Sequence, residues 1–329
     1  MSAGRRTGLA ALAAIALLTT FAPLIVPYDP GRQFADYPYA PPMRPHVRSA
    51  DGWHLPFVYP IRAVDRLERE YGADRAVRMP LRWGAHGRLL SVDEGASPWF
   101  LLGSDGLGRD VLSRVLLGAR LSLGVSAAAT LLALLIGATI GAAAGLTRGW
   151  RDELLMRGAD FVLVLPAIYV VLALRAALPL VLSTREVFAA LVLVLGLVGW
   201  PAVARGVRAI VAAEGSQEYA EAARAAGAGP WRILQHHLLP AARGFLFVQA
   251  CVLVPAFVLA EATLSFVGLG FAAPAASWGA MLQDAASVRT LAEAPWLLAP
   301  AAAIVATVFA VHLAAATPPE PWLWRDGGH

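Results

Sequence analysis

The chain has 329 residues, of which 58% are hydrophobic and only 15% are charged. An average soluble protein is roughly half apolar and about a quarter charged, so this composition excludes an ordinary soluble domain and predicts an integral membrane protein. The net charge is +4, and all positive side chains other than histidine are arginines. The single cysteine, Cys251, excludes an internal disulfide and a cluster of thiol metal ligands.

Apolar runs long enough to cross a bilayer recur along the chain. A spanning helix needs about 20 predominantly apolar residues. Five uncharged runs and a sixth interrupted only by Arg175 reach or approach this length, at residues 9–27, 121–147, 161–180, 187–204, 244–260 and 294–319. We therefore predict an all-α membrane protein with six transmembrane helices. The first run also has features of a signal peptide, but it is long for one and no small-residue cleavage site stands out before Pro27.

The segment 28–118 separates the first two predicted spans. Residues 28–60 are rich in proline and aromatic side chains, which favours irregular structure or short strands. Residues 61–77 carry apolar side chains at helical spacing and predict a short amphipathic helix. A second amphipathic helix is predicted over 104–123, with Asp105 as the cap at its start.

The distribution of arginine predicts the orientation in the membrane. Arg5 and Arg6 precede the first span, and eight more arginines lie in the loops 148–157 and 205–243. Positive residues favour the cytoplasmic side, so both termini are expected in the cytoplasm and segment 28–118 outside, and the arginines indicate topology rather than nucleic-acid binding. The expected parts are a cytoplasmic N-terminus with the first span (1–27), the external segment (28–118), five further spans (119–318) and a cytoplasmic tail (319–329).

The polar stretch between the fourth and fifth spans is long for a connector. It predicts two helices, over 209–227 and 230–239, with a turn at Gly227 and Gly229, a first-turn Pro230 and a terminal Pro240. Alanine gives the first helix high propensity with little bulk, so another protein could approach its backbone closely and hold it in a groove. A solvated hairpin whose alanines only reflect the overall composition fits the spacing equally well.

Residues 221–240 resemble the EAA loop of the membrane subunits of type I ABC importers, through Glu221, Ala222, Ala223, Gly227, Leu239 and Pro240. His237 stands where isoleucine is common, a variant similar to the dipeptide, oligopeptide and nickel branch. Further stretches resemble that branch at 101–123, 151–166, 259–270 and 274–282. The resemblance covers roughly residues 100–312; the long external segment and the tail after His312 depart from the usual pattern of the branch.

The resemblance implies a permease subunit in a prokaryotic plasma (inner) membrane, forming half of an ATP-driven translocation pathway for peptides or a similar small solute. The implied partners are a second related permease, two cytoplasmic ABC ATPase subunits, an external substrate-binding protein and membrane lipid. In that family the EAA helix docks in a groove of the ATPase, so the matching residues of loop 214–240 carry over as the coupling contact. The implied mechanism is alternating access.

Other polar residues have two readings each. Arg175 either extends to the outer interface or meets a peptide carboxylate, and Glu261 with Thr263 and Ser265 lies either on the pathway or between helices. His236 and His237 point about 100° apart on a helix, which does not suit a shared metal. The sequence has no Walker A motif, so ATP and magnesium are expected on the partner ATPase and no cofactor on this chain. No catalytic motif is found either, and the alternative to a permease is a membrane enzyme or scaffold without transport.

Overall fold

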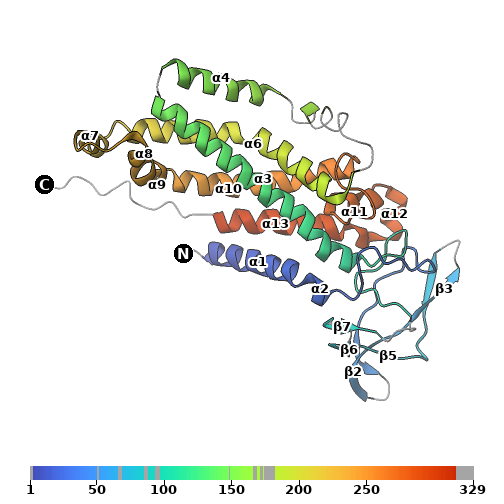
Figure 1. Ribbon diagram of the computed structural model, residues 1–329. Helices are drawn as coiled ribbons and strands as arrows, with labels where there is room; N and C mark the ends of the chain where they lie inside the picture. Colours follow the sequence, from blue (N-terminus) through green and yellow to red (C-terminus); the bar gives the residue numbers. More distant parts are fainter. Residues whose placement is uncertain are drawn as a thin grey trace. The chain divides into compact units, whose positions relative to one another are not determined.

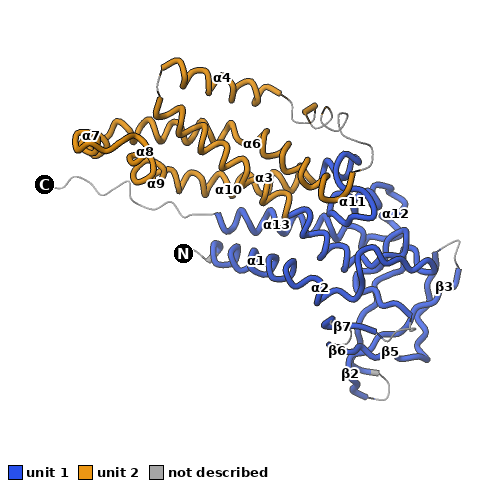
Figure 2. Tube along the Cα trace, in the orientation of Figure 1, with its two compact units in different colours: residues 1–123, 262–329 blue, residues 124–261 orange. Residues whose placement is uncertain are grey.

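The computed structural model describes residues 3–49, 52–65, 69–84, 88–92, 97–147, 149–165, 169–170, 173 and 182–315 (Figure 1). The chain divides into two compact units, residues 1–123 with 262–329 (unit 1) and residues 124–261 (unit 2), shown in different colours in Figure 2. Each unit is described by itself below. The described chain is mostly helical, with short strands confined to unit 1.

Four helices of the described chain are long and apolar enough to cross a membrane. They are Val111–Thr147 (α3), Thr184–Glu214 (α6), Arg243–Phe266 (α10) and the segment Pro295–Ala315, which joins the short 3-10 helix η3 (Pro295–Leu298) to α13 (Ala299–Ala315). These four helices contain most of four predicted spans. The first predicted run is split at Phe21 into α1 (Ala3–Thr20) and α2 (Ala22–Ile25). Most of the run 161–180, including Arg175, lies outside the described residues, so the count of six stays a prediction.

In unit 2, α3 and α6 pack through a row of glycines. Gly137, Gly141 and Gly145 recur every four residues and therefore share one face of α3. A Cβ atom on Gly141 would lie 2.4 Å from the carbonyl oxygen of Ala204, and one on Gly145 would lie 2.8 Å from the side chain of Val211. The absence of side chains along this row lets the two helices approach closely. Helix α4 (Trp150–Val164) also packs on α6, with Ala159 buried against Trp200 and Ala204.

Unit 1 holds the two ends of the described chain. Gly8 of α1 lies against Leu313 and Ala314, so the start of α1 meets the end of α13 and the two helices run antiparallel (Figure 1). Between α10 and α13 the chain forms α11 (Trp278–Asp284) and α12 (Val288–Glu293). The backbone amide of Trp278 donates to Ser122 Oγ at 3.1 Å, and its indole donates to the carbonyl of Val115 at 3.0 Å. These bonds attach α11 to the first half of α3.

The segment between the first two spans forms short antiparallel strands. Strands β1 (His46–Ser49), β2 (Gly52–Val58) and β5 (Met79–Pro80) make one sheet in the order β1-β2-β5. Two pairs follow, β3 (Ile61–Asp65) with β4 (Glu70–Ala73) and β6 (Arg82–Trp83) with β7 (Leu90–Ser91). Their apolar core consists of Ala40, Met43, Val58, Ile61, Met79, Leu81, Trp99 and Phe100. The prediction of irregular structure and short strands over 28–60 is confirmed, and the all-α description does not extend to this segment.

The predicted amphipathic helix over 61–77 is wrong. Ile61 joins the buried core whereas Val64 is 73% exposed, so the apolar positions do not share one buried face. Pairing between Ile61 and Ala73 and between Ala63 and Tyr71 satisfies the backbone groups as a hairpin instead. Helical spacing over one short segment was therefore a misleading signal.

The predicted amphipathic helix over 104–123 is corrected as well. Helix α3 starts at Val111 and continues without a break through the second span. Its cap is Asp110, whose Oδ2 accepts from the backbone amide of Ser113 at 2.8 Å, whereas Asp105 accepts from the amides of Leu107 and Arg109 in the preceding turn. Gly108, with φ of +70°, holds that turn in a conformation that favours glycine and separates Asp105 from the helix.

Candidate functional site

The polar connector between α6 and α10 in unit 2 is the predicted coupling site. The predicted helix over 209–227 is wrong as one element, because α6 continues to Glu214 and a separate helix α7 (Glu218–Ala225) follows. The Tyr219 hydroxyl donates to the Glu214 carboxylate at 2.5 Å, and the Arg224 guanidinium donates to the carbonyl of Gly215 at 2.6 Å. The break at Gly215 therefore folds α7 back against the end of α6, and both bonds fix its angle.

Helix α7 presents small side chains on an exposed face. Ala220 is buried, Ala223 is half-buried, and Glu221 and Ala222 are exposed. The helix ends in a Schellman motif: the amide of Gly227 donates to the carbonyl of Arg224 and that of Ala228 to the carbonyl of Ala223. Gly227 has φ of +84°, as this motif requires. The predicted turn at Gly227 is thus confirmed, and it closes a short, rigid, exposed helix.

The second half of the connector anchors α7 to the unit. Pro230 opens α8 (Pro230–Ile233) as predicted, and a π-helix, η2 (Leu234–Leu238), leads into α9 (Leu239–Ala241). The prediction that Pro240 ends the second helix is wrong, because Pro240 lies within α9. The Leu239 amide donates to the carbonyl of Leu234, five residues back, and the chain passes through Pro240, which has no N–H to donate.

Apolar side chains fix this second half on α6. Ile233, Leu234 and Leu238 are buried together with residues of α3 and α6, namely Ala142, Val203, Val207 and Val211. Leu239 and Pro240 are half-buried at the base of the connector. The predicted coupling residues therefore form two groups: Glu221, Ala222 and Gly227 are exposed, whereas Ala223, Leu239 and Pro240 are half-buried.

Two ion pairs join α4 to α6 beside the connector. Arg208 donates to both carboxylate oxygens of Asp152, each at 2.5 Å, and Arg205 pairs with Asp160. The hydrogen bonds from Arg208 hold the pKa of Asp152 below its usual range. Sequence reasoning missed both pairs, since the partners of the first lie 56 residues apart and no local pattern relates them.

The other predicted site residues are dispersed. Glu261 and Ser265 are buried in α10, and Ser265 Oγ accepts from the backbone amide of Phe271 at 3.0 Å, which is a structural contact. Thr263 is exposed. His236 bonds the carbonyl of Arg232, while His237 lies 5.7 Å from the Tyr219 ring, measured between centroids. Within the described residues no group of His, Cys, Asp or Glu is placed to hold a metal ion.

A buried charged cluster in unit 1 was also missed. Arg109 Nε lies 2.7 Å from Asp105 Oδ2, and another nitrogen of Arg109 lies 3.6 Å from Asp284 of α11. Arg114 Nε lies 3.5 Å from the same oxygen of Asp105. Burial raises the pKa of Asp110 to about 6. The pairing of Asp105 with Arg109 at i, i+4 was the available signal.

Four long apolar helices joined by polar connectors define a multi-pass membrane protein. Residues 137–317, more than half of the chain, match the family model described as "Binding-protein-dependent transport system inner membrane component", and the chain belongs to this family. It is a permease subunit of an ABC importer, on the branch that contains the peptide permeases.

Curated relatives match over most of the chain. The oligopeptide transport system permease OppC of Bacillus subtilis is 38% identical over 222 residues, which are 67% of this chain and 70% of OppC. The di/tripeptide permease DppC of Pseudomonas aeruginosa is 32% identical over 313 residues, 94% of this chain and 84% of DppC. The glutathione permease GsiD of Pectobacterium atrosepticum is 35% identical over 68% of this chain and 71% of GsiD. A solved structure of the inward-facing MetNI methionine ABC transporter covers 60% of this chain and 91% of its own, with 19% identity and a TM-score of 0.47.

Proposed function

We propose that this chain forms half of a translocation pathway for short peptides. Its relatives are described as permeases for oligopeptides, di/tripeptides and glutathione, which are all peptides. The proposed complex contains a second related permease, two ABC ATPase subunits and an external substrate-binding protein. ATP and magnesium bind to the ATPases, so this chain is a transporter subunit without a cofactor of its own. No observation favours the alternative of an enzyme or scaffold.

The proposed topology has six spans in a prokaryotic inner membrane, with both termini in the cytoplasm. It places segment 28–118 outside and the five spans of 119–318 after it, followed by a cytoplasmic tail at 319–329. The arginines of the connector support its cytoplasmic position, since positive residues are favoured there. The strand-rich core around Phe100 and Met43 supports a folded, rather than extended, external segment.

The observation that carries the coupling proposal is the exposed small face of α7, held rigidly on α6. Glu221 and Ala222 are open to a partner, and Gly227 lets the chain turn directly beneath them. We assign this face to the groove of the ATPase. Because Tyr219 and Arg224 bond the end of α6, a displacement of α7 is transmitted to a membrane-spanning helix. Such rigid-body motion is one way to alternate access between two sides of a membrane.

The structure gives the polar residues of α10 different degrees of support as contacts for the transported solute. Glu261 is fully buried within this chain, which supports a role between helices. Ser265 is committed to the amide of Phe271. Thr263 is exposed and is the better candidate for contact with solute or with the second permease. For Arg175 both proposals stand: extension to the outer interface or contact with a peptide carboxylate.

Affinity purification of the full chain with its ATPase tests the coupling proposal. Ala222→Trp places a bulky ring on the exposed face of α7 and should abolish recovery of the ATPase while membrane insertion is unchanged. Ala292→Trp makes the same substitution on an exposed position of α12 and should recover the ATPase normally. Normal recovery with Ala222→Trp would refute the assignment of this face.

A further inference from the structure

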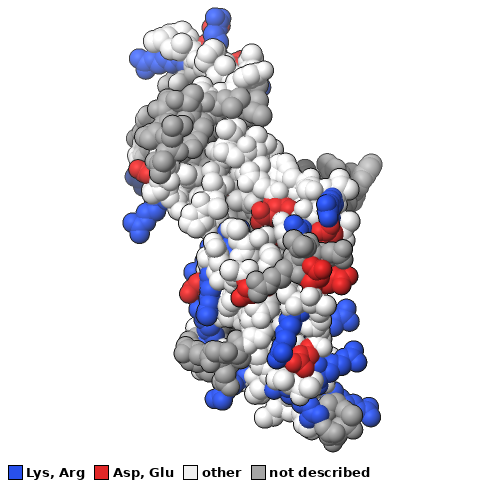
Figure 3. All heavy atoms as spheres, turned by 90° about the vertical axis from the view of Figure 1, so that its right-hand side faces the viewer, with Lys and Arg blue, Asp and Glu red and all other residues white. Residues whose placement is uncertain are grey.

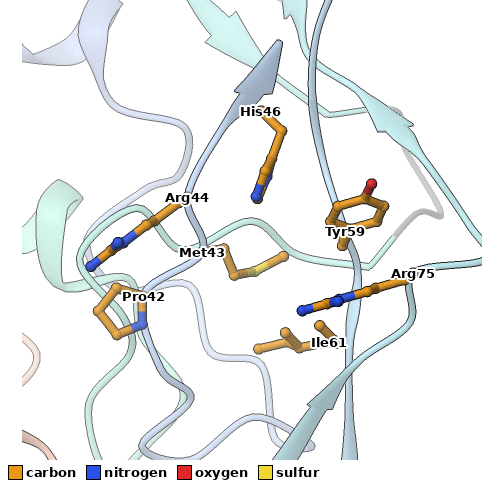
Figure 4. A pocket seen from close by; sticks show the side chains of 8 residues that line it. Pro42, Met43, Arg44, His46, Tyr59, Ile61 and Arg75 are labelled. Atoms are coloured by element: carbon orange, nitrogen blue, oxygen red, sulfur yellow. The ribbon is translucent and has the colours of Figure 1, made fainter. Parts of the chain in front are cut away.

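An open cleft in unit 1 lies between β1, the start of β3 and the turn after β4. Its volume is about 450 Å³, and its lining includes Pro42, Met43, Arg44, His46, Tyr59, Ile61, Ala73 and Arg75 (Figure 4). This volume falls in the range of roughly 300 to 1,000 Å³ that is typical of small-molecule sites. All of these residues lie outside the family match at 137–317.

The cleft combines an apolar floor with a polar rim. Met43 and Ile61 are only 4% and 6% exposed and belong to the core of the strand region. In Figure 4 the side chains of His46 and Arg75 point toward Met43 from different parts of the chain, and the ring of Tyr59 stands beside them. The guanidinium of Arg44 lies at the other end of the cleft, beside Pro42. An apolar group thus meets the floor while a polar group meets the rim.

The cationic groups of the cleft are not neutralised by the chain itself. Three other arginines of this segment pair with carboxylates: Arg62 with Asp74 at 3.3 Å, Arg69 with Glu293 at 3.0 Å and Arg88 with Asp29 at 3.3 Å. Among the residues that the structure describes, neither Arg44 nor Arg75 has a carboxylate within ion-pair distance. Figure 3 faces the strand-bearing end of unit 1, where arginine and acidic side chains both lie at the surface. The rim therefore offers the guanidinium groups of Arg44 and Arg75 to an anion.

Hydrogen bonds fix the backbone turn that carries Arg75. The amide of Asp74 donates to the carbonyl of Pro60 at 2.8 Å, and its Oδ1 accepts from the amide of Ala76 at 3.1 Å. Since the other carboxylate oxygen of Asp74 pairs with Arg62, Asp74 fixes the turn without neutralising Arg75. A guanidinium on a fixed turn loses less conformational freedom when it binds an anion.

The opposite wall is rigid for a different reason. The ring of His46 lies 5.1 Å from that of Tyr59 and 5.9 Å from that of Phe57, between centroids. The amide of Met43 donates to the carbonyl of Phe100 at 2.7 Å, and the Met43 carbonyl accepts from the Trp99 indole at 3.2 Å. The floor is therefore part of the packed core, and ring contacts order the wall beside it.

We propose that this cleft binds a small carboxylate ligand that carries an apolar group, of which a short peptide with an apolar C-terminal residue is the matching class. Arg75 binds the carboxylate, because a guanidinium fits its two oxygens. Met43 and Ile61 receive the apolar side chain, and Tyr59 packs beside it. Inorganic phosphate can bind Arg75 but has no apolar group to contact Met43 and Ile61. This inference does not depend on transport, since binding to the cleft needs neither ATPase nor ATP.

Isothermal titration of the purified full chain in lipid nanodiscs tests the proposal, with the tripeptide Ala-Ala-Leu as the probe. The peptide should bind at one site per chain, and its C-terminal amide should bind at least tenfold more weakly. Arg75→Gln should lower the affinity for the peptide by about tenfold to a hundredfold, the usual effect of losing a hydrogen bond to a charged group. Arg82→Gln removes the same charge from the same segment outside the cleft and should leave the affinity unchanged.

Several outcomes would overturn the proposal. They are no binding of the peptide, equal binding of acid and amide, and an unchanged affinity with Arg75→Gln. Competition by inorganic phosphate as strong as that by the peptide would show an unselective anion site and would also overturn it. Each of these results leaves the coupling proposal untouched, because recovery of the ATPase with Ala222→Trp is measured without peptide.

Discussion

Replacing Gly141 by alanine tests the close packing of α3 on α6. The new Cβ atom would lie 2.4 Å from the carbonyl oxygen of Ala204, whereas ordinary contacts begin at 3.4 Å, so the helices must separate by about 1 Å. The contacted atom belongs to the backbone of α6 and cannot rotate away. Overpacking of this kind costs about 1 to 3 kcal/mol, and the gain in helix propensity offsets about 1 kcal/mol. The difference is a net loss of about 0 to 2 kcal/mol, and we expect about 1 kcal/mol.

Gly158 supplies the matched control, since a Cβ atom there meets nothing within 4 Å. Gly158→Ala should stabilise the protein by about 0.5 to 1 kcal/mol through helix propensity alone. Thermal unfolding in one detergent should place Gly141→Ala about 2 to 4 °C below the wild type and Gly158→Ala slightly above it. If Gly141→Ala melts at or above the wild-type temperature, the close approach of α3 and α6 at this position is refuted.

Three further changes have defined outcomes. Burial raises the pKa of Asp110 from 3.8 to about 6, so the folded state binds this proton more tightly than the unfolded state. The free energy of unfolding of the wild type should therefore fall by about 3 kcal/mol as the pH rises from about 4 to 6. Chemical unfolding of Asp110→Asn over the same pH range should lack this decrease. Arg208→Met should lower the free energy of unfolding by about 1 kcal/mol above pH 5. The loss should be smaller in acid, because the lowered pKa of Asp152 contributes stability that disappears as this carboxylate is protonated. A double-mutant cycle with Asp152→Asn measures the coupling energy of the pair. Gly227→Ala should destabilise the end of α7 by about 1 to 2 kcal/mol, because the backbone at Gly227 has a positive φ. Gly229 has a φ of −69°, so Gly229→Ala should be tolerated. Hydrogen exchange of the α7 amides compares the two variants.

Apolar length was a reliable guide to the long helices. In a bilayer, an uncharged run of about 20 residues can satisfy all its backbone hydrogen bonds within the segment by forming a helix. The runs 121–147 and 187–204 therefore lie in α3 and α6, although both helices extend further into polar sequence. Parts of these extensions were predicted, but as separate helices over 104–123 and 209–227; hydropathy did not show that they continue the membrane helices, because charged residues such as Arg208 lie outside the apolar runs.

The connector was predicted in part. Alanine propensity and Pro230 indicated two helical segments, and Gly227 indicated the turn between them. The break at Gly215 was missed, since bonds from Tyr219 and Arg224 stabilise it and these depend on the fold. Exposure of Glu221 and Ala222 likewise follows from the burial of Ala220 on the other side of α7.

Long-range pairing accounts for the remaining differences. The hairpin of β3 and β4 replaced a predicted helix because Ile61 joins a core whose other members lie as far away as Phe100. The contact between Arg109 and Asp284 joins residues that lie 175 positions apart in the sequence. Local periodicity contains no information about such partners, so sequence reasoning found four long membrane helices and the connector but not the packing that fixes them.

The most direct test of the account is peptide accumulation by proteoliposomes that contain this chain with its second permease, ATPases and external binding protein. We predict that a labelled tripeptide accumulates only with hydrolysable ATP, that Ala222→Trp abolishes accumulation, and that Ala292→Trp retains it. ATP-driven accumulation that persists undiminished with Ala222→Trp would contradict the claim that α7 receives the ATPase. Equal accumulation with and without ATP would contradict the proposed function as a whole.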